Sequence, residues 1–190
     1  MQNIIQERIQ ASINVKQLLL EDLSLLERIE QVVKTCIDAF NADKKILFAG
    51  NGGSAADAQH LAAEFSGRFY IDRKPLFAEA LHVNTSYLTA VANDYSYDEI
   101  YARLLIAKGR PGDVFFGIST SGNSGNIIRA IEVAKKQGMI VVGMTGATGG
   151  KMQELCDHLL NMPSTDTPRI QEAHILVGHI ICELVEAELF

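Results

Sequence analysis

The chain has 190 residues, of which 47% are hydrophobic, and its 23 acidic residues outnumber 17 basic ones, giving a formal net charge of −6. This length suits a single domain with ample apolar material for a packed core. An acidic chain without basic clusters argues against nucleic acid or an anionic membrane as the main partner. No apolar run approaches the roughly 20 residues of a membrane span, and residues 1–10 contain no apolar signal-peptide block. We therefore expect a cytoplasmic protein.

The first 42 residues predict two helices. Apolar residues recur at helical spacing in both segments: Ile5, Ile9, Ile13 and Leu20 in the first, and Ile29, Val33, Ile37 and Phe40 in the second. Asp22 lies between the two segments and is the predicted N-cap of the second helix. These two stripes are more apolar surface than a monomer would leave in water, so we expect residues 1–42 to form a helical oligomerisation segment.

From Lys45 the pattern changes to alternating strands and helices. The predicted strands are 46–50, 76–81, 114–119, 139–145 and 158–162. The predicted helices are 54–68, 85–92, 98–107, 123–137, 150–156 and 167–190. Continuous Val, Ile, Leu and Phe runs separated by helices indicate a parallel sheet covered on both faces. The expected fold is a three-layer αβα sandwich with a five-stranded parallel sheet, in one domain spanning 1–190 with its α/β core at 43–190. Ligands should bind at the carboxyl ends of the strands, near the point where strand order reverses.

The three cysteines, Cys36, Cys156 and Cys182, are far apart in the sequence, and no C-x-x-C pair occurs. An odd number of scattered cysteines argues against a disulfide framework or a cysteine-based zinc site. We expect three free, buried thiols in a reducing compartment.

A glycine loop, Gly50–Ala55, leaves the first strand and enters a helix. Its glycines permit positive φ and close approach of a ligand to free backbone amides at the helix start. No Gly-Lys-Ser/Thr follows, so it is not a Walker A loop. The loop fits the loose G-x-G-x-x-A dinucleotide pattern, but no acidic residue ends the second strand as that interpretation requires. A tight turn with a purely structural role is the other alternative.

A serine loop, Ser119–Ser124, follows the third strand and precedes a helix. Four hydroxyls in six residues, beside the positive end of a helix dipole, indicate a site for a phosphate monoester. The loop contains no Lys or Arg, so neutral donors would hold the phosphate more weakly than a charged clamp. The alternative is an ordinary Ser/Asn-rich turn that caps the helix.

Two helices carry a further set of polar residues. His60 and Glu64 are four residues apart and share one helix face, and Gln171 and His179 are eight apart on the last helix. Two imidazoles, a carboxylate and an amide suit a divalent metal or acid–base chemistry. Taken alone, a pair such as His60 and Glu64 is more often a surface pair, and a lone histidine such as His179 is more often a core residue.

Together these residues resemble the sugar isomerase (SIS) domain family, and especially its phosphoheptose isomerase members. The resemblance covers nearly the whole chain. It rests jointly on the strings GNGGSAADAQH (50–60), AND (92–94), GISTSGNS (117–124) and RIQE with a following His (169–174).

The resemblance implies that sedoheptulose 7-phosphate is isomerised to D-glycero-D-manno-heptose 7-phosphate, the entry to ADP-heptose for lipopolysaccharide. It implies Glu64 as general base, His179 as general acid, and one Zn²⁺ per subunit on His60, Glu64, Gln171 and His179. The implied substrate contacts are Asn51, Gly52, Gly53, Glu64, Asn93, Asp94, Ser119, Thr120, Ser121, Ser124 and Gln171. A homotetramer with shared active sites is also implied. Pro168 departs from members that have Asp before the Arg-Ile-Gln string, so no carboxylate acts there.

Two other function classes share parts of this pattern. One is the non-catalytic, replication-initiator-associating branch of the family, whose members lack the base and the last-helix histidine. The other is a sugar-phosphate-sensing regulator, which would normally carry a DNA-binding helix-turn-helix domain. This chain retains both Glu64 and His179, and its first 45 residues are not basic. An isomerase is therefore the favoured interpretation.

Overall fold

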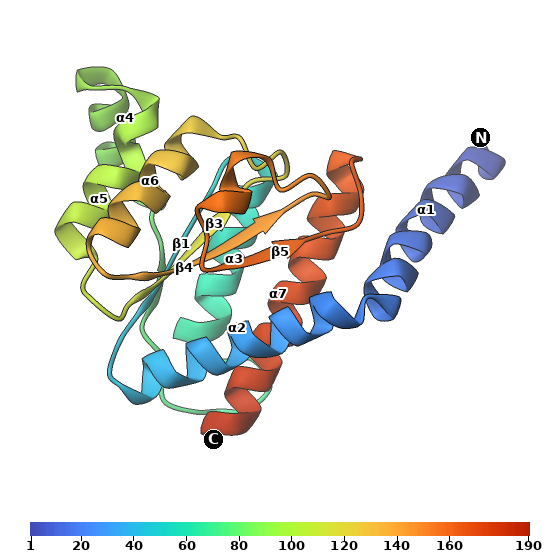
Figure 1. Cartoon of the computed structure of the whole chain (residues 1–190), viewed down its shortest axis with the longest axis horizontal. Coiled ribbons are helices and arrows are strands. Elements are labelled where there is room, and N and C mark those ends of the chain that lie inside the picture. Colours follow the sequence, from blue (N-terminus) through green and yellow to red (C-terminus); the bar gives the residue numbers. More distant parts are fainter.

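The computed structural model describes all residues from Met1 to Phe190 (Figure 1). Its strands are β1 (Ile46–Gly50), β2 (Ala78–Ala80), β3 (Val114–Ile118), β4 (Ile140–Thr145) and β5 (His158–Asn161). Its α-helices are α1 (Gln2–Glu21), α2 (Leu23–Asn41), α3 (Gly53–Ser66), α4 (Thr85–Asp94), α5 (Ile100–Lys108), α6 (Gly125–Lys136) and α7 (Thr167–Leu189). Two short 3₁₀ helices are η1 (Tyr97–Glu99) and η2 (Gly150–Glu154).

All five strands pair in parallel, in the order β2-β1-β3-β4-β5. The predicted five-stranded parallel sheet and three-layer α/β fold are confirmed. Chain order reverses between β1 and β3, so the loops after these two strands flank the crevice where such sheets bind ligands. These are the glycine loop and the serine loop of the sequence.

Two apolar clusters fill the space on the two faces of the sheet. The larger cluster joins α2, α3 and α7 to one face, through strand residues such as Phe48 and Phe116. The smaller cluster joins α4, α5 and α6 to the other face, through Leu47 and Phe115. Successive strand residues point to opposite faces, and every residue of the central strands β1 and β3 is buried because helices cover both sides.

The N-terminal helices differ in how they are packed. Helix α2 begins after Asp22, whose Oδ1 accepts a hydrogen bond of 2.9 Å from the Leu25 amide, as the N-cap prediction requires. The buried face of α2 packs on the core, whereas α1 extends away from the body of the molecule (Figure 1). The apolar stripe of α1 is exposed, with Ile5, Ile9 and Ile13 each more than half accessible.

Strand β2 is shorter than the predicted 76–81. The Leu76 amide donates to the Phe65 carbonyl at the end of α3, and the chain reaches β1 only at Phe77, whose carbonyl accepts the Ile46 amide. Residues 150–156 form a 3₁₀ helix only as far as Glu154. All three cysteines are free, but Cys156 is only partly buried. No helix combines the length and the apolarity that a lipid bilayer crossing demands.

Candidate active site

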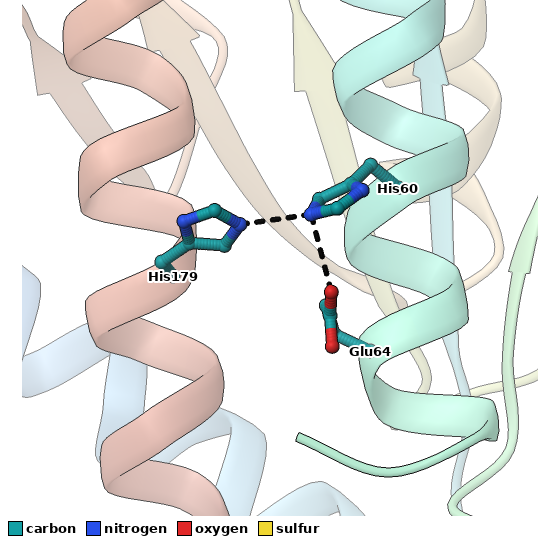
Figure 2. Close-up of side chains that lie close together, drawn as sticks. All are labelled: His60, Glu64 and His179. Carbon is teal, nitrogen blue, oxygen red and sulfur yellow. Dashed lines mark hydrogen bonds and ion pairs between the residues drawn. The ribbon is translucent and has the colours of Figure 1, made fainter. Parts of the chain in front are cut away.

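His60, Glu64 and His179 converge between α3 and α7 (Figure 2). The Nε2 of His60 lies 2.9 Å from Nε2 of His179 and 3.1 Å from Oε1 of Glu64. His60 and Glu64 meet because residues four apart lie one above the other on a helix. His179 comes from α7, which runs parallel to α3: Gly178 lies against Leu61 so closely that a Cβ would come within 2.6 Å of the Leu61 methyls. Glycine at that position lets the two helices approach.

This cluster suits both proton transfer and a metal ion. One ligand atom from each of the three residues lies within 4.8 Å of the other two. Tetrahedral zinc binds imidazole and carboxylate at about 2.0–2.2 Å, which places its ligand atoms about 3.4 Å from one another. Glu64 is about a quarter exposed and His60 about half, so the cluster is open to a ligand from one side. Two imidazoles and one carboxylate with an open side have the composition of a catalytic zinc site.

Gln171, expected as a fourth metal ligand, comes from near the start of α7. Its side-chain amide packs against the start of α3, where a Cβ on Gly53 would come within 2.5 Å of Nε2. Gln171 therefore lies beside the glycine loop, and it remains a predicted metal ligand and substrate contact.

Asp57, which the sequence analysis did not select, lies one turn before His60 on α3. One of its carboxylate oxygens is buried without a hydrogen-bond partner. Burial raises the pKa of Asp57 to about 6, although the neighbouring His60 charge lowers it. The sequence could have indicated Asp57, because a residue three positions before His60 lies on the same face of a helix.

Two reciprocal side-chain hydrogen bonds join the glycine loop after β1 to the start of α6, which follows β3. Asn51 and Asn126 each donate an Nδ2–H to the Oδ1 of the other, at 2.9 and 2.8 Å, and Tyr97 Oη donates to Asn51 Oδ1 at 3.1 Å. The Asn51 side chain therefore links β1 to the start of α6 and to η1. Gly52 has φ +56° with open space around it, and Gly53 begins α3. The exposed backbone of Gly52 and Gly53 is the part of this loop that a substrate can contact.

The serine loop separates into two pairs of side chains. Ser119, which is buried, shares a 2.8 Å hydrogen bond with Ser124, whereas Thr120 and Ser121 line a cavity of about 260 Å³. Gly122, at φ +66°, shapes the turn, because a Cβ there would come within 2.1 Å of the Gly149 carbonyl. Only two of the four predicted hydroxyl residues line that cavity.

The opposite wall of this cavity consists of residues that the sequence analysis missed. Ser164 and Thr165, from the loop between β5 and α7, and Thr167, the first residue of α7, line it. The sequence did contain a pattern that could have identified them. Three hydroxyl residues follow the last strand, just as four hydroxyl residues follow the third strand. The cavity thus lies at the carboxyl ends of β3, β4 and β5, where a parallel sheet binds ligands.

Asn93 and Asp94 lie at the end of α4, where both are exposed and hydrogen-bonded to each other at 2.9 Å. Apart from this bond, neither side chain forms a hydrogen bond with another predicted site residue, and both remain predicted substrate contacts. Pro168 occupies the first turn of α7, where a missing amide hydrogen costs no helical hydrogen bond.

Comparison with known proteins identifies the family. The SIS domain profile matches residues 13–146. The phosphoheptose isomerase of Aneurinibacillus thermoaerophilus is 57% identical over 190 residues, covering 100% of this chain and 96% of the relative. The structure of the Neisseria gonorrhoeae phosphoheptose isomerase has a TM-score of 0.92 at 42% identity, with 98% of each chain covered. A phosphoheptose isomerase from Francisella tularensis has a TM-score of 0.93 at 33% identity, with 97% of each chain covered.

These matches extend over both N-terminal helices and the last helix, and so include every residue of the cluster between α3 and α7. The profile match alone spans more than half of the chain. The chain therefore belongs to the SIS domain family and is an isomerase of the phosphoheptose isomerase group.

Proposed function

We propose that this isomerase converts sedoheptulose 7-phosphate to D-glycero-D-manno-heptose 7-phosphate, a precursor of ADP-heptose for lipopolysaccharide. The observation that carries the proposal is the convergence of a carboxylate and two imidazoles on one point. A ketose–aldose isomerisation needs one group that removes a carbon-bound proton and another that protonates a carbonyl oxygen. The name of the Aneurinibacillus thermoaerophilus relative, a phosphoheptose isomerase 57% identical to this chain, supports a phosphorylated heptose as the substrate.

In the proposed reaction Glu64 removes a proton from C1 of the open-chain ketose. The electron pair forms the C1–C2 double bond, and His179 protonates the C2 oxygen to give an enediol. The O1 proton then leaves as a proton returns to C2, which yields the aldehyde at C1 and a hydroxyl at C2. Imidazole suits the second role because its ordinary pKa lies near neutral pH.

We also propose that His60, Glu64 and His179 hold one zinc ion, with Gln171 as the fourth ligand. A bound zinc ion would supply Lewis-acid polarisation of the two oxygens on C1 and C2. Elemental analysis after dialysis should then find about one zinc per chain, with loss on chelation. A His60→Ala variant should lose the ion while remaining folded. A protein that stays fully active and contains no zinc would contradict this assignment.

The remaining predicted residues are proposed to bind the rest of the substrate. Thr120 and Ser121, in the cavity with Ser164 and Thr165, would hold the phosphate with neutral donors. The backbone of Gly52 and Gly53 and the Gln171 amide would bind sugar hydroxyls.

Incubation of the purified protein with sedoheptulose 7-phosphate, followed by NMR of the aldose product, tests the proposed function. Glu64→Gln and His179→Ala should each lower kcat by at least about 100-fold, the usual contribution of a general acid or base. Glu30→Gln is the matched control, because Glu30 also forms an i,i+4 ion pair on a helix but lies on α2. Turnover near the wild-type rate in Glu64→Gln would remove Glu64 from the role of base.

A further inference from the structure

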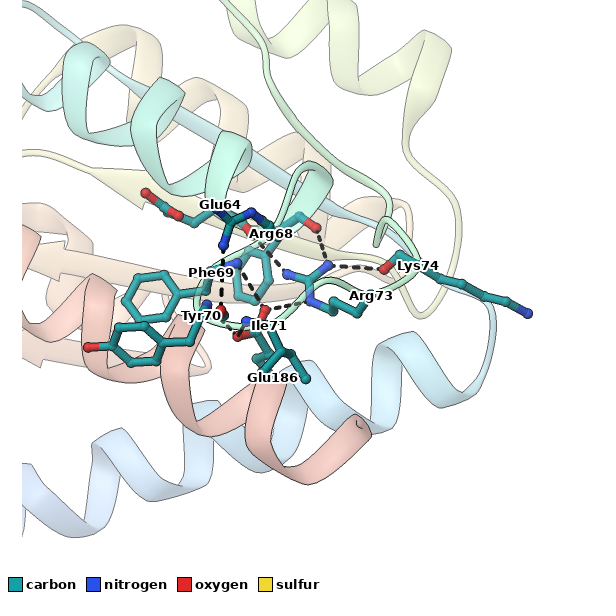
Figure 3. Close-up of polar contacts among 9 residues, drawn as sticks. Glu64, Arg68, Phe69, Tyr70, Ile71, Arg73, Lys74 and Glu186 are labelled. Carbon is teal, nitrogen blue, oxygen red and sulfur yellow. Dashed lines mark hydrogen bonds and ion pairs between the residues drawn. The ribbon is translucent and has the colours of Figure 1, made fainter.

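The segment between α3 and β2 wraps around one buried carboxylate, Glu186, near the end of α7 (Figure 3). Glu186 is only 3% exposed. Its Oε1 accepts the Phe69 amide at 2.9 Å, and its Oε2 accepts the Tyr70 and Ile71 amides at 2.6 and 3.1 Å. Three consecutive backbone amides are therefore fixed by a single side chain.

Arg73 completes this arrangement from the other side. Its Nε donates to Glu186 Oε1 at 2.7 Å, and its side chain is 2% exposed. Its two terminal nitrogens donate at 2.9 Å to the carbonyls of Phe65 and Glu64, which end α3 without helical partners. The guanidinium thus caps the helix that carries Glu64 and joins it to the helix that carries His179.

Every oxygen of the Glu186 carboxylate accepts hydrogen bonds, so the ionised form is favoured in spite of its burial. Burying Glu186 would by itself raise its pKa, but three amide hydrogen bonds and Arg73 lower the pKa to about 2. A buried carboxylate with four donors keeps its charge, whereas one that lost a donor would bear an uncompensated desolvation penalty. The planar Arg73 guanidinium donates to several acceptors at once in a fixed geometry, which a lysine ammonium cannot reproduce.

The segment held in this way reaches the proposed acid–base pair directly. The Phe69 ring lies 5.8 Å from the His179 ring, centroid to centroid. Glu186 follows His179 by seven residues, so both project from the same side of α7. The Glu64 carbonyl is itself an acceptor of Arg73. One ion pair therefore fixes the backbone of the proposed base and a ring beside the proposed acid.

We propose that Glu186 and Arg73 are positioning residues, which set the placement of Glu64 relative to His179 through the segment 67–73. This inference rests on the proposed function for the roles of Glu64 and His179. Neither residue of the pair touches the reacting atoms. Their effect is on alignment, and alignment errors of about 1 Å cost up to about 100-fold in rate.

Glu186→Gln tests the proposal, because it keeps the shape of the side chain but places a donor against the backbone amides. We expect kcat to fall at least about tenfold with little change in KM. Arg73→Lys, which keeps the charge and loses the fork, should do the same. If Glu186→Gln does not fold, Arg73→Lys tests the proposal by the same measurements of kcat and KM.

Asp113→Asn is the matched control. Asp113 is also a buried carboxylate, 1% exposed, and it accepts the Lys45 ammonium at 2.6 Å and the Arg110 amide at 2.8 Å. It lies at the amino ends of β1 and β3, opposite the candidate site. We expect Asp113→Asn to lower Tm as Glu186→Gln does, while kcat stays at the wild-type value.

The imidazole NMR signal of His179 gives a readout that is independent of turnover. The signal is assigned from its absence in a His179→Gln spectrum. It should shift in Glu186→Gln and Arg73→Lys, because Phe69 moves relative to His179, and stay unchanged in Asp113→Asn. An unshifted signal, or a kcat loss that Asp113→Asn reproduces at equal Tm, overturns the positioning role. If the wild-type protein does not act on sedoheptulose 7-phosphate, the proposed function is contradicted. The shift of the His179 NMR signal would then still test whether Glu186 and Arg73 position His179.

Discussion

His174 is the most deeply buried histidine of the protein, although it lies only three residues from Gln171. It is fully buried, and its Nε2 lies 3.1 Å from the Thr145 carbonyl, which can only accept, so Nε2 carries the hydrogen. Its Nδ1 is buried without a partner. Burial lowers the pKa of His174 to about 4, despite the carbonyl contact, which favours the protonated form. The residue is a neutral core donor and takes no part in the proposed chemistry.

This pKa predicts acid sensitivity with a defined sign. Between pH 6.5 and about 4 the unfolded chain binds a proton at His174 and the folded protein does not, so the free energy of unfolding falls as pH falls through this range. His174→Gln keeps a donor for Thr145 and removes the titration. We expect the difference in Tm between pH 7.5 and pH 4.5 to be smaller in His174→Gln than in the wild type, by differential scanning calorimetry. An equal difference in both proteins would show that other groups cause the acid sensitivity.

A second prediction at this scale concerns Thr120, because this residue lines the cavity proposed for the phosphate. Thr120→Val keeps the shape and removes the hydroxyl. We expect binding of the phosphate end to weaken by about 1–2 kcal/mol, the value of one lost hydrogen bond. In kinetics, KM for sedoheptulose 7-phosphate should rise while turnover of unphosphorylated sedoheptulose stays as low as in the wild type. Unchanged KM would exclude this hydroxyl as a phosphate donor.

At the scale of elements, the site depends on two loops that meet at the carboxyl edge of the sheet. The serine loop touches the loop after β4 at Gly122, where a Cβ would come within 2.1 Å of the Gly149 carbonyl. Gly150 is similarly close to the Ser121 carbonyl, at 2.5 Å for an added Cβ. The two loops therefore set each other's conformation, and both line the cavity.

Gly122→Ala should separate this loop contact from simple backbone strain. Gly138→Ala is the control, since Gly138 also has a positive φ of +73° but its nearest neighbour would be an ordinary 3.5 Å away. Strain alone costs about 1–2 kcal/mol for a residue with a Cβ in the left-handed region. We expect Gly122→Ala to lower Tm more than Gly138→Ala and to weaken substrate binding, which Gly138→Ala leaves unchanged. Equal effects of the two variants would mean that the loop contact does not shape the cavity.

At the scale of the whole molecule, α1 has apolar surface that the single chain leaves uncovered. Only Val15 and Leu19 of this helix are buried, while Ile4, Ile5, Ile9 and Ile13 are each more than half exposed. Arg169 at the start of α7 donates to the Arg8 carbonyl at 2.7 Å and so fixes where α1 leaves the body. A helix held outward with an exposed stripe supports the proposal that residues 1–42 assemble subunits.

We predict a closed tetramer, because such stripes pack best as helices from neighbouring subunits around a shared core. Light scattering should give about four times the 20.8 kDa chain mass at micromolar concentration. Ile5→Glu combined with Ile9→Glu, on the exposed stripe, should lower this mass without unfolding the α/β core. As a control, glutamate at Gln6 and Gln10, which are also exposed on α1, should leave the mass unchanged. A monodisperse and active monomer of the wild type would contradict this role of α1.

The sequence by itself determined the order of strands and helices, the parallel sheet and the location of the ligand loops. These follow from hydrophobic periodicity and from residue types at strand ends, which are local properties. The pairing of His60 with Glu64 was predictable for the same reason, since helical spacing of four places them together.

Only the tertiary structure decided which residues meet across elements. His60 and His179 are 119 residues apart and come together because α3 and α7 lie in parallel on one face of the sheet. Helical phase predicted that Gln171 and His179 share one side of α7, but only the structure shows that the Gln171 amide packs against the start of α3. Glu186 and Arg73 could not be paired from the sequence, because a buried charge is recognised by the donors around it and these come from a segment that only folding brings near.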